Sequence, residues 1–214
     1  MFFPAVGLVI GMAIGTITFV PLPYSNPVII VLILILSFCI TGGLHLDGLA
    51  DTFDGFYGQR SAEDRLIIMK DSRVGVMGVL GLISIIALKG SLLLMVPMES
   101  LLKALLVMTL YSRFSLVFAC FFASSARKES AGKIFIGQVS LLNFLLSSVF
   151  TLAVLVVLLE FKGVMLFFIL IIPIIAFLQL SKIKIGGTTG DTLGALNEII
   201  EVMVLVVLVS GLLI

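Results

Sequence analysis

Polar chemistry is scarce in this sequence, which has no tryptophan, one histidine and two cysteines among 214 residues, and only 12% charged residues. So few Cys and His residues cannot supply the four ligands of a structural zinc site. Cys39 and Cys120 both lie inside apolar runs, where we expect small apolar side chains and no disulfide. Because the formal net charge is only +1, the chain also lacks the basic surface of a nucleic-acid-binding protein.

Apolar residues, by contrast, are abundant: 61% of the chain is hydrophobic and the mean hydropathy is +1.33, whereas soluble domains contain about 45–50% apolar residues. The apolar runs reach the ~20 residues that cross a bilayer as a helix and lack the alternating pattern of a transmembrane barrel. We therefore predict an all-α fold, a polytopic transmembrane helix bundle forming a single domain over residues 1–214. No basic segment precedes the first run, which indicates a first span and not a cleaved signal peptide.

Seven membrane spans are expected from the apolar runs. They cover residues 3–20, 27–46, 74–97, 103–123, 139–159, 163–181 and 192–214. Lys and Arg concentrate in the loops 47–73, 124–138 and 182–191, which the positive-inside rule places in the cytoplasm together with the N-terminus. The acidic clusters and the Gly-rich turns fall on this same face, so a site built from several loops is possible there.

The stretch GGLHLDGLADTFDG carries three aspartates directly after an apolar run. Asp47, Asp51 and Asp54 have helical spacing and would share one stripe of a helix. Three carboxylates beside a bilayer repel one another unless a cation lies among them, and hard oxygen ligands favour Mg²⁺. The alternative is a helix end whose acids are merely solvated. His45, the one histidine, could be a general base, although a structural role is the better interpretation.

Basic residues in the neighbouring loops are suited to phosphate oxygens. Ser61 and Asp64 resemble a capping box and predict a short interfacial helix that ends near Lys70. Arg113 falls inside a predicted span, where a buried guanidinium requires a partner or a cavity. The candidate phosphate ligands are Arg60, Lys70, Arg73, Arg113 and Arg127. The alternative for the loop residues is that they only set the membrane topology.

The stretch KIKIGGTTGDTLGALNEIIEV places a Gly- and Thr-rich turn before the last helix. Gly187 and Gly190 would allow the tight backbone of an anion site at a helix start. Asp191, Glu198 and Glu201 then follow on a second acidic stripe, although Asp191 could instead cap the helix. Clustered carboxylates, scattered cations and Gly-rich turns on one face together indicate metal-assisted chemistry on a phosphoanhydride or phosphodiester.

Three blocks in this order, GGLHLDGLADTFDG, R-x4-R-x3-MKDSRVGVMG and GGTTGDTLGALNEIIE, resemble the signatures of the cobalamin synthase family, the adenosylcobinamide-GDP ribazoletransferases or cobalamin-5'-phosphate synthases. The likeness extends from about Phe3 to the C-terminus. Family members usually carry some thirty further N-terminal residues, with a basic stretch before the first span. We expect this chain to differ from them in whatever that stretch contributes.

The resemblance implies a Mg²⁺-dependent catalytic domain in a prokaryotic inner membrane, with a cytoplasmic active site. It would join adenosylcobinamide-GDP to α-ribazole or α-ribazole 5'-phosphate and release GMP. The metal ligands would be Asp47, Asp51, Asp54 and Asp191, which together with Glu198 are the candidate catalytic residues. Glu201, Gly187, Gly190 and the basic residues named above would contact the substrates. The resemblance leaves open whether the chain forms a homo-oligomer.

Two other functions stay open at this stage. The aspartate pattern also resembles that of CDP-alcohol phosphatidyltransferases, which run the same reaction type, although the spacing departs from theirs. A cation transporter would need acids deep in several spans, whereas here they gather at one end.

Overall fold

The computed structural model describes residues 2–19, 26–126 and 135–210, and this part of the chain is helical apart from one isolated bridge. The all-α prediction is confirmed. The helices are α1 (Phe3–Gly15), the 3-10 turn η1 (Thr16–Phe19), α2 (Asn26–Thr41), α3 (Leu44–Phe56), α4 (Ala62–Ile68), α5 (Val76–Met95), α6 (Met98–Phe122), α7 (Leu141–Leu159), α8 (Phe161–Ile169), α9 (Ile171–Ile185) and α10 (Gly190–Val209).

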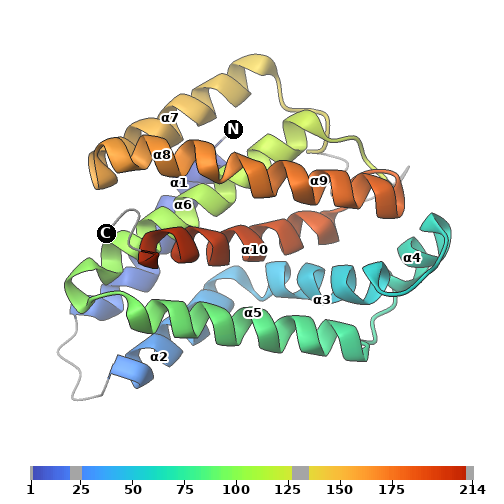
Figure 1. The fold of residues 1–214 in the computed structure, drawn as a ribbon, viewed down its shortest axis with the longest axis horizontal. Coiled ribbons are helices and arrows are strands. Elements are labelled where there is room, and N and C mark those ends of the chain that lie inside the picture. The colour runs from blue at the N-terminus through green and yellow to red at the C-terminus, as the bar shows by residue number, and fades with distance from the viewer. Residues whose placement is uncertain (1, 20–25, 127–134, 211–214) are drawn as a thin grey trace.

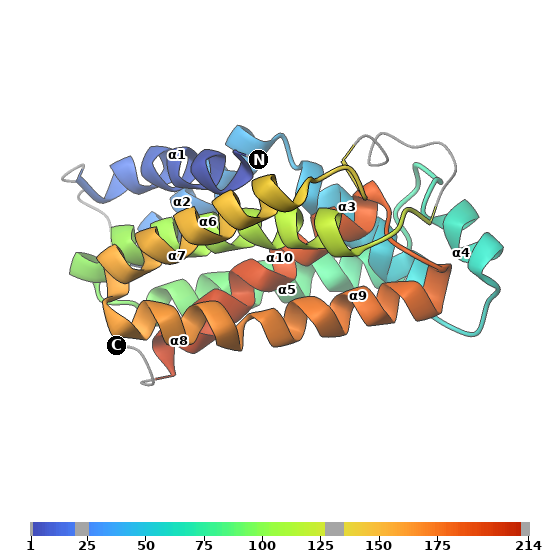
Figure 2. The same ribbon diagram turned by 90° about the horizontal axis from the view of Figure 1, so that it is seen from above.

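The helices form an elongated bundle, and most of the loops between them lie near its two ends (Figure 1). One end holds α4, the C-terminal end of α3 and the turn between α9 and α10, and we call it the α4 end. The α5–α6 and α7–α8 connections lie at the opposite end. Seen from above, α1 runs along α6, and α8 and α9 form one edge of the bundle (Figure 2). The sequence predicted that the loops rich in Lys and Arg share one end of the bundle. For the described residues of these loops, this arrangement agrees with the prediction.

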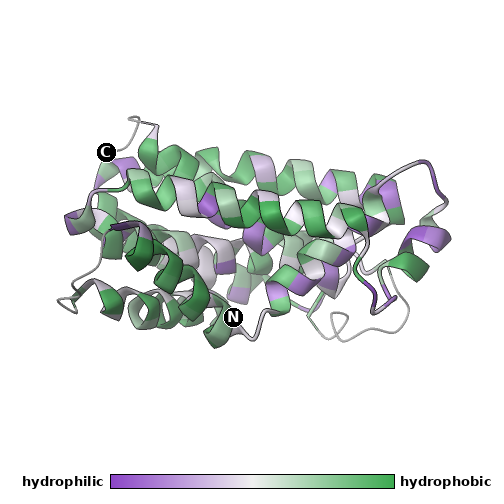
Figure 3. Ribbon diagram, turned by 90° about the horizontal axis from the view of Figure 1, so that it is seen from below, coloured by the Kyte–Doolittle hydropathy of each residue, from purple (hydrophilic) through white to green (hydrophobic). Residues whose placement is uncertain are grey.

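Among the described residues, five helical segments are long and apolar enough to cross a membrane, or six when the bent pair α2 and α3 counts as one. The predicted span 3–20 corresponds to Phe3–Phe19, a shorter apolar helix. Along the bundle the ribbon is dominated by hydrophobic residues, while hydrophilic residues gather on α4 and the loops beside it (Figure 3). This distribution is typical of a multi-pass membrane protein.

The span predicted over residues 27–46 is interrupted, and this part of the prediction is wrong. Helix α2 ends at Thr41, and the chain turns by 91° before α3 begins at Leu44. Gly42 and Gly43 make the turn in the left-handed region, with φ of 61° and 69°, which glycine adopts without steric cost. As a result, α3 carries its acids as a helix separate from the apolar run before it.

The boundaries of the other helices differ less from the prediction. The span predicted at 163–181 is the pair α8 and α9 with a break at Leu170, and the last span is described from Gly190 to Val209. The predicted short helix is confirmed as α4, and its predicted cap is present: Ser61 accepts a hydrogen bond from the Asp64 backbone at 3.1 Å. Cys39 and Cys120 are free thiols, as predicted.

Candidate active site

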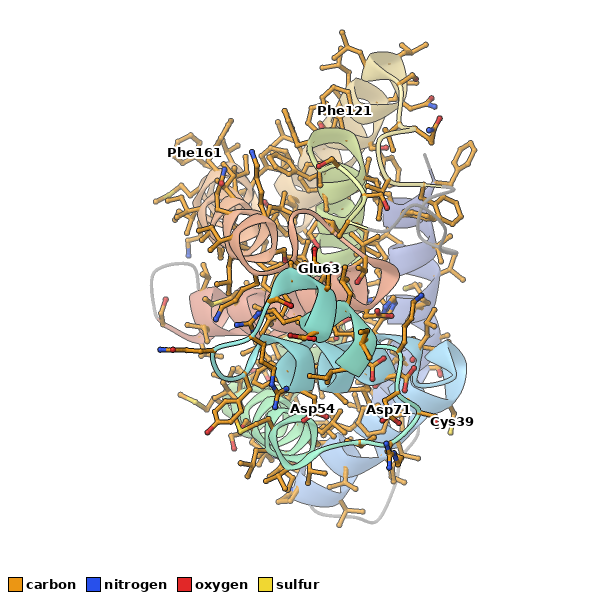
Figure 4. All side chains as sticks on the ribbon, turned by 90° about the vertical axis from the view of Figure 1, so that its right-hand side faces the viewer. Cys39, Asp54, Glu63, Asp71, Phe121 and Phe161 are labelled. Carbon is orange, nitrogen blue, oxygen red and sulfur yellow. The ribbon has the colours of Figure 1, made fainter. Side chains whose placement is uncertain are left out.

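Helix α3 carries Asp47, Asp51 and Asp54 on one helix, as the spacing predicted. Asp47 is exposed, while Asp51 and Asp54 are half-buried. The α4 end, which includes Asp54 in the last turn of α3, is seen face-on in Figure 4, where Asp54, Glu63 and Asp71 are labelled. The α2–α3 bend places Asp47 in the first turn of α3, where the positive end of the helix dipole favours a carboxylate.

Asp54 fixes the start of the neighbouring helix α5. Its two carboxylate oxygens accept hydrogen bonds from the backbone N–H groups of Gly75 at 2.7 Å and Gly78 at 2.8 Å. These are N–H groups of the first turn of α5, which have no partner within the helix. Asp54 therefore links α3 to α5. It can be a metal ligand only if it binds the ion while it also accepts these two hydrogen bonds.

Helices α3 and α10 approach each other closely at Gly48. A Cβ atom there would lie 2.6 Å from the backbone oxygen and 2.9 Å from the Cα atom of Asp191. Only glycine allows this approach without moving one helix. The contact brings the α3 segment that carries Asp47 and Asp51 against the backbone of Asp191.

We expect Gly48→Ala to lower the melting temperature in detergent, because the added methyl group pushes α3 from α10 and overpacking costs about 1–3 kcal/mol. Gly90→Ala on α5 is the matched control, since its Cβ would meet only a Leu34 methyl group at 3.4 Å. The control should melt at the wild-type temperature or above it. Equal melting temperatures for the two variants would contradict the close approach.

Helix α10 begins with a capping box made by two threonines. The Thr189 hydroxyl accepts from the Thr192 backbone at 3.2 Å, and the Thr192 hydroxyl accepts from the Thr189 backbone at 2.8 Å. The N-cap is thus Thr189, and the alternative in which Asp191 caps the helix is wrong. Asp191 lies in the first turn and accepts a hydrogen bond from the Thr189 hydroxyl at 3.3 Å.

The turn before α10 packs against the end of α6. The Thr188 N–H donates to the Ser124 carbonyl, and the Ala126 N–H donates to the Thr188 carbonyl, each at 2.9 Å. A Cβ at Gly187 would lie 2.6 Å from the Ser124 oxygen. Gly187 therefore has a packing role, and the Thr188 N–H is already bonded. Gly190 is exposed at the start of α10.

Arg65 holds the chain after α3 in place. Only 5% of its surface is exposed, and its guanidinium donates to the carbonyls of Gly55, Gly58 and Arg60 at 2.9, 2.7 and 3.2 Å. Lys184 of α9 donates to the Phe56 carbonyl at 3.3 Å. These two cations bond carbonyls that would otherwise lack partners at the C-terminal end of α3.

The predicted phosphate ligands of the α3–α5 connection lie on the surface of the α4 end. Arg60, Lys70 and Arg73 are exposed. Arg73 pairs with Asp71 at 2.6 Å, and this guanidinium lowers the pKa of Asp71 to about 2. Asp71 is therefore ionised at any pH well above 2, and it partly neutralises Arg73. Arg127 lies outside the described residues.

A buried ion network, which the sequence analysis did not predict, links α5, α6 and α10. Lys89 donates to Glu198 and to Glu201, each at 2.6 Å, and Arg113 pairs with Glu201. All four side chains are buried. Asn197 and Ser112 donate to Glu201 at 3.2 and 3.3 Å. Two cations and two carboxylates leave the network formally neutral, as burial away from water requires.

The network changes the interpretation of three predicted site residues. The structure brings Glu198, Glu201 and Arg113 to one another and to Lys89, around a cavity of about 10 Å³ that Leu46 and Thr41 also line. The second acidic stripe is therefore neutralised within the bundle. Lys89 could have been found from the sequence, because it is the one charged residue in the predicted span 74–97.

Over residues 2–19, 26–126 and 135–210, no group of three or more His, Cys, Asp and Glu side chains is placed to hold a metal ion. The hard oxygen donors of Asp47 and Asp51, with Asp191 beside Gly48, still match the chemistry of Mg²⁺. This ion is typically bound by one or two carboxylates, with substrate phosphates and water completing its octahedral shell.

Comparisons with known proteins identify the family of this chain. The family model described as Cobalamin-5-phosphate synthase matches residues 1–209. The chain is 38% identical to the adenosylcobinamide-GDP ribazoletransferase of Clostridium tetani over 211 residues, which cover 97% of this chain and 83% of that protein. It is 37% identical to the enzyme of the same name from Thermoanaerobacter pseudethanolicus over 217 residues, covering 98% and 85%. No solved structure matches significantly.

These matches confirm the resemblance that the three sequence blocks indicated, and they extend over nearly all of the chain. They support neither a CDP-alcohol phosphatidyltransferase nor a cation transporter. The chain belongs to the cobalamin-5-phosphate synthase family.

Proposed function

We propose that this chain joins adenosylcobinamide-GDP to α-ribazole or its 5'-phosphate and releases GMP, with Mg²⁺ as cofactor. The observation that carries the proposal is the contact of α3 with α10 at Gly48, which brings the Asp47 and Asp51 segment against Asp191. The family membership supplies the substrates. The polar α4 end would face the cytoplasm of a prokaryotic inner membrane.

Two of the carboxylates Asp47, Asp51 and Asp191 would hold the metal together with phosphate oxygens of the substrate. When bound, Mg²⁺ neutralises negative charge on the phosphoanhydride oxygens. Asp54 keeps the start of α5 in place, so that α3 presents its acids at a fixed angle. Arg60, Lys70 and Arg73, exposed on the α4 end, would bind phosphate oxygens from the water side.

The reaction is a displacement at the phosphorus next to cobinamide. A ribose hydroxyl of α-ribazole forms the new P–O bond, the bond to GMP breaks, and a carboxylate of the acidic site takes the hydroxyl proton. Glu198, Glu201 and Arg113 would act as positioning residues in this scheme. Their network with Lys89 fixes α10 against α5 and α6, which in turn holds Asp191 against α3.

Nucleotide release tests the proposal. Purified protein in detergent or liposomes is incubated with Mg²⁺, adenosylcobinamide-GDP and a CDP-alcohol donor, with and without α-ribazole. We expect GMP release that requires α-ribazole, stops when EDTA removes divalent ions and resumes when Mg²⁺ is restored. Release of CMP alone would overturn the proposal, and undiminished GMP release in EDTA would overturn the metal assignment.

A further inference from the structure

A cavity of about 400 Å³ opens between α6, α9 and the turn before α10. Of the groups described above, it shares only the contact between the end of α6 and the turn before α10, and this turn leads directly into Asp191. Its lining includes Phe118, Phe122, Ile175, Leu178, Lys182 and Thr188. The contact of Thr188 with the end of α6, described above, gives the cavity a fixed wall next to the start of α10.

The cavity is mainly apolar and has an aromatic side. The rings of Phe118 and Phe122 lie 4.6 Å apart at 41°, and both line it from α6. Ile175 and Leu178 line it from α9. A flat aromatic ring system can stack on such a surface, and its volume falls within the range of small-molecule sites.

Cationic and polar groups also belong to the lining. Lys182 and Gln179, both exposed, border the cavity from α9. The ammonium group of a lysine binds a phosphate as a point charge. An apolar aromatic wall with one nearby cation matches a nucleoside that has an apolar base and a phosphate on its sugar.

We propose that this cavity binds the benzimidazole base of α-ribazole and that Lys182 binds the 5'-phosphate of the phosphorylated form. The assignment rests on the proposed function. Of the two substrates, the corrinoid is far too large for the cavity, and guanine would leave its polar edge facing apolar walls. The dimethylbenzimidazole base is apolar and flat, and its ribose would lie towards Thr188, next to the start of α10.

Direct binding tests the assignment without turnover. Because the chain has no tryptophan, the fluorescence anisotropy of α-ribazole can be followed while protein in detergent is added. We expect Phe122→Ala to weaken binding roughly tenfold, as loss of a stacked base contact does. Phe168→Ala on α8 is the matched control, since Phe122 and Phe168 are both 59% exposed. Ile175→Phe, which fills the cavity without removing an aromatic ring, should weaken binding as well.

Steady-state kinetics then distinguish binding of the base from binding of the phosphate. Lys182→Gln should raise KM for α-ribazole 5'-phosphate at least about fivefold and leave KM for α-ribazole unchanged. KM for adenosylcobinamide-GDP should not change in any cavity variant. Lys162→Gln, an exposed lysine at the opposite end, is the control.

Unchanged α-ribazole affinity in Phe122→Ala and Ile175→Phe would overturn the assignment and leave a lipid chain as the occupant. A rise in KM for adenosylcobinamide-GDP instead would assign the cavity to the other substrate and equally overturn it. If the wild type binds α-ribazole in the anisotropy assay but releases no GMP, the proposed function fails while the binding site stands.

Discussion

Asp51→Asn should lower the rate of GMP release at least about 100-fold, the size of effect expected when a group that stabilises transition-state charge is removed. Asp51 lies in the middle of α3, one turn from Asp47, on the helix that packs against Asp191. Asparagine keeps the volume but removes the negative charge, so a metal ligand would be lost while the packing stays. The rate is measured as GMP released per protein at saturating substrates.

The control for this variant is Glu63→Gln, which neutralises an exposed acid on α4 at the same end of the bundle. It should retain the wild-type rate, and both variants should insert and melt like the wild type. Full activity in Asp51→Asn would remove Asp51 from the site. Equal losses in both variants would show that the charge of the α4 end matters and not Asp51 itself.

Lys89→Met should destabilise the protein by about 3–5 kcal/mol, because it leaves two buried carboxylates with one cation. Lys89 is the only partner that reaches both Glu198 and Glu201 with short ion pairs, since Arg113 pairs with Glu201 alone among the described salt bridges. The expected result is a large drop in the melting temperature in detergent. Lys103→Met, which removes an exposed lysine of α6, is the control and should melt like the wild type.

A second substitution separates charge from packing. Lys89→Met combined with Glu198→Gln restores neutrality, with Arg113 facing Glu201, so the double variant should be more stable than Lys89→Met alone. Losses that simply add would contradict the neutral network. A wild-type melting temperature for Lys89→Met would show that the network does not hold the helices together.

Much of the fold could be predicted because it follows from local chemistry. Apolar runs predicted the helices, the Ser61 and Asp64 pair predicted α4, and the spacing of three aspartates predicted one helix. The bend at Gly42 and Gly43 was missed, since apolar residues continue up to it and hydropathy alone does not report a left-handed turn.

Residues of the site were harder to assign for a different reason. Whether an acid faces substrate or a buried cation depends on which helices pack together, and that is a long-range property. Glu198 and Glu201 share a helix face with Asp191, yet they meet Lys89 from a helix more than one hundred residues away. Gly187 shows the same limit of prediction from sequence. A tight turn and a close backbone contact both require glycine, so the sequence alone does not distinguish them.

The most direct test of the account is whether α3 and α10 hold one metal ion together. Mn²⁺, used in place of Mg²⁺, is titrated into protein with adenosylcobinamide-GDP bound and α-ribazole absent, and the bound ion is measured by electron paramagnetic resonance. We predict that Asp51→Asn and Asp191→Asn each weaken Mn²⁺ binding at least about tenfold, as loss of groups around a metal commonly does. Wild-type Mn²⁺ affinity in both variants would contradict the account.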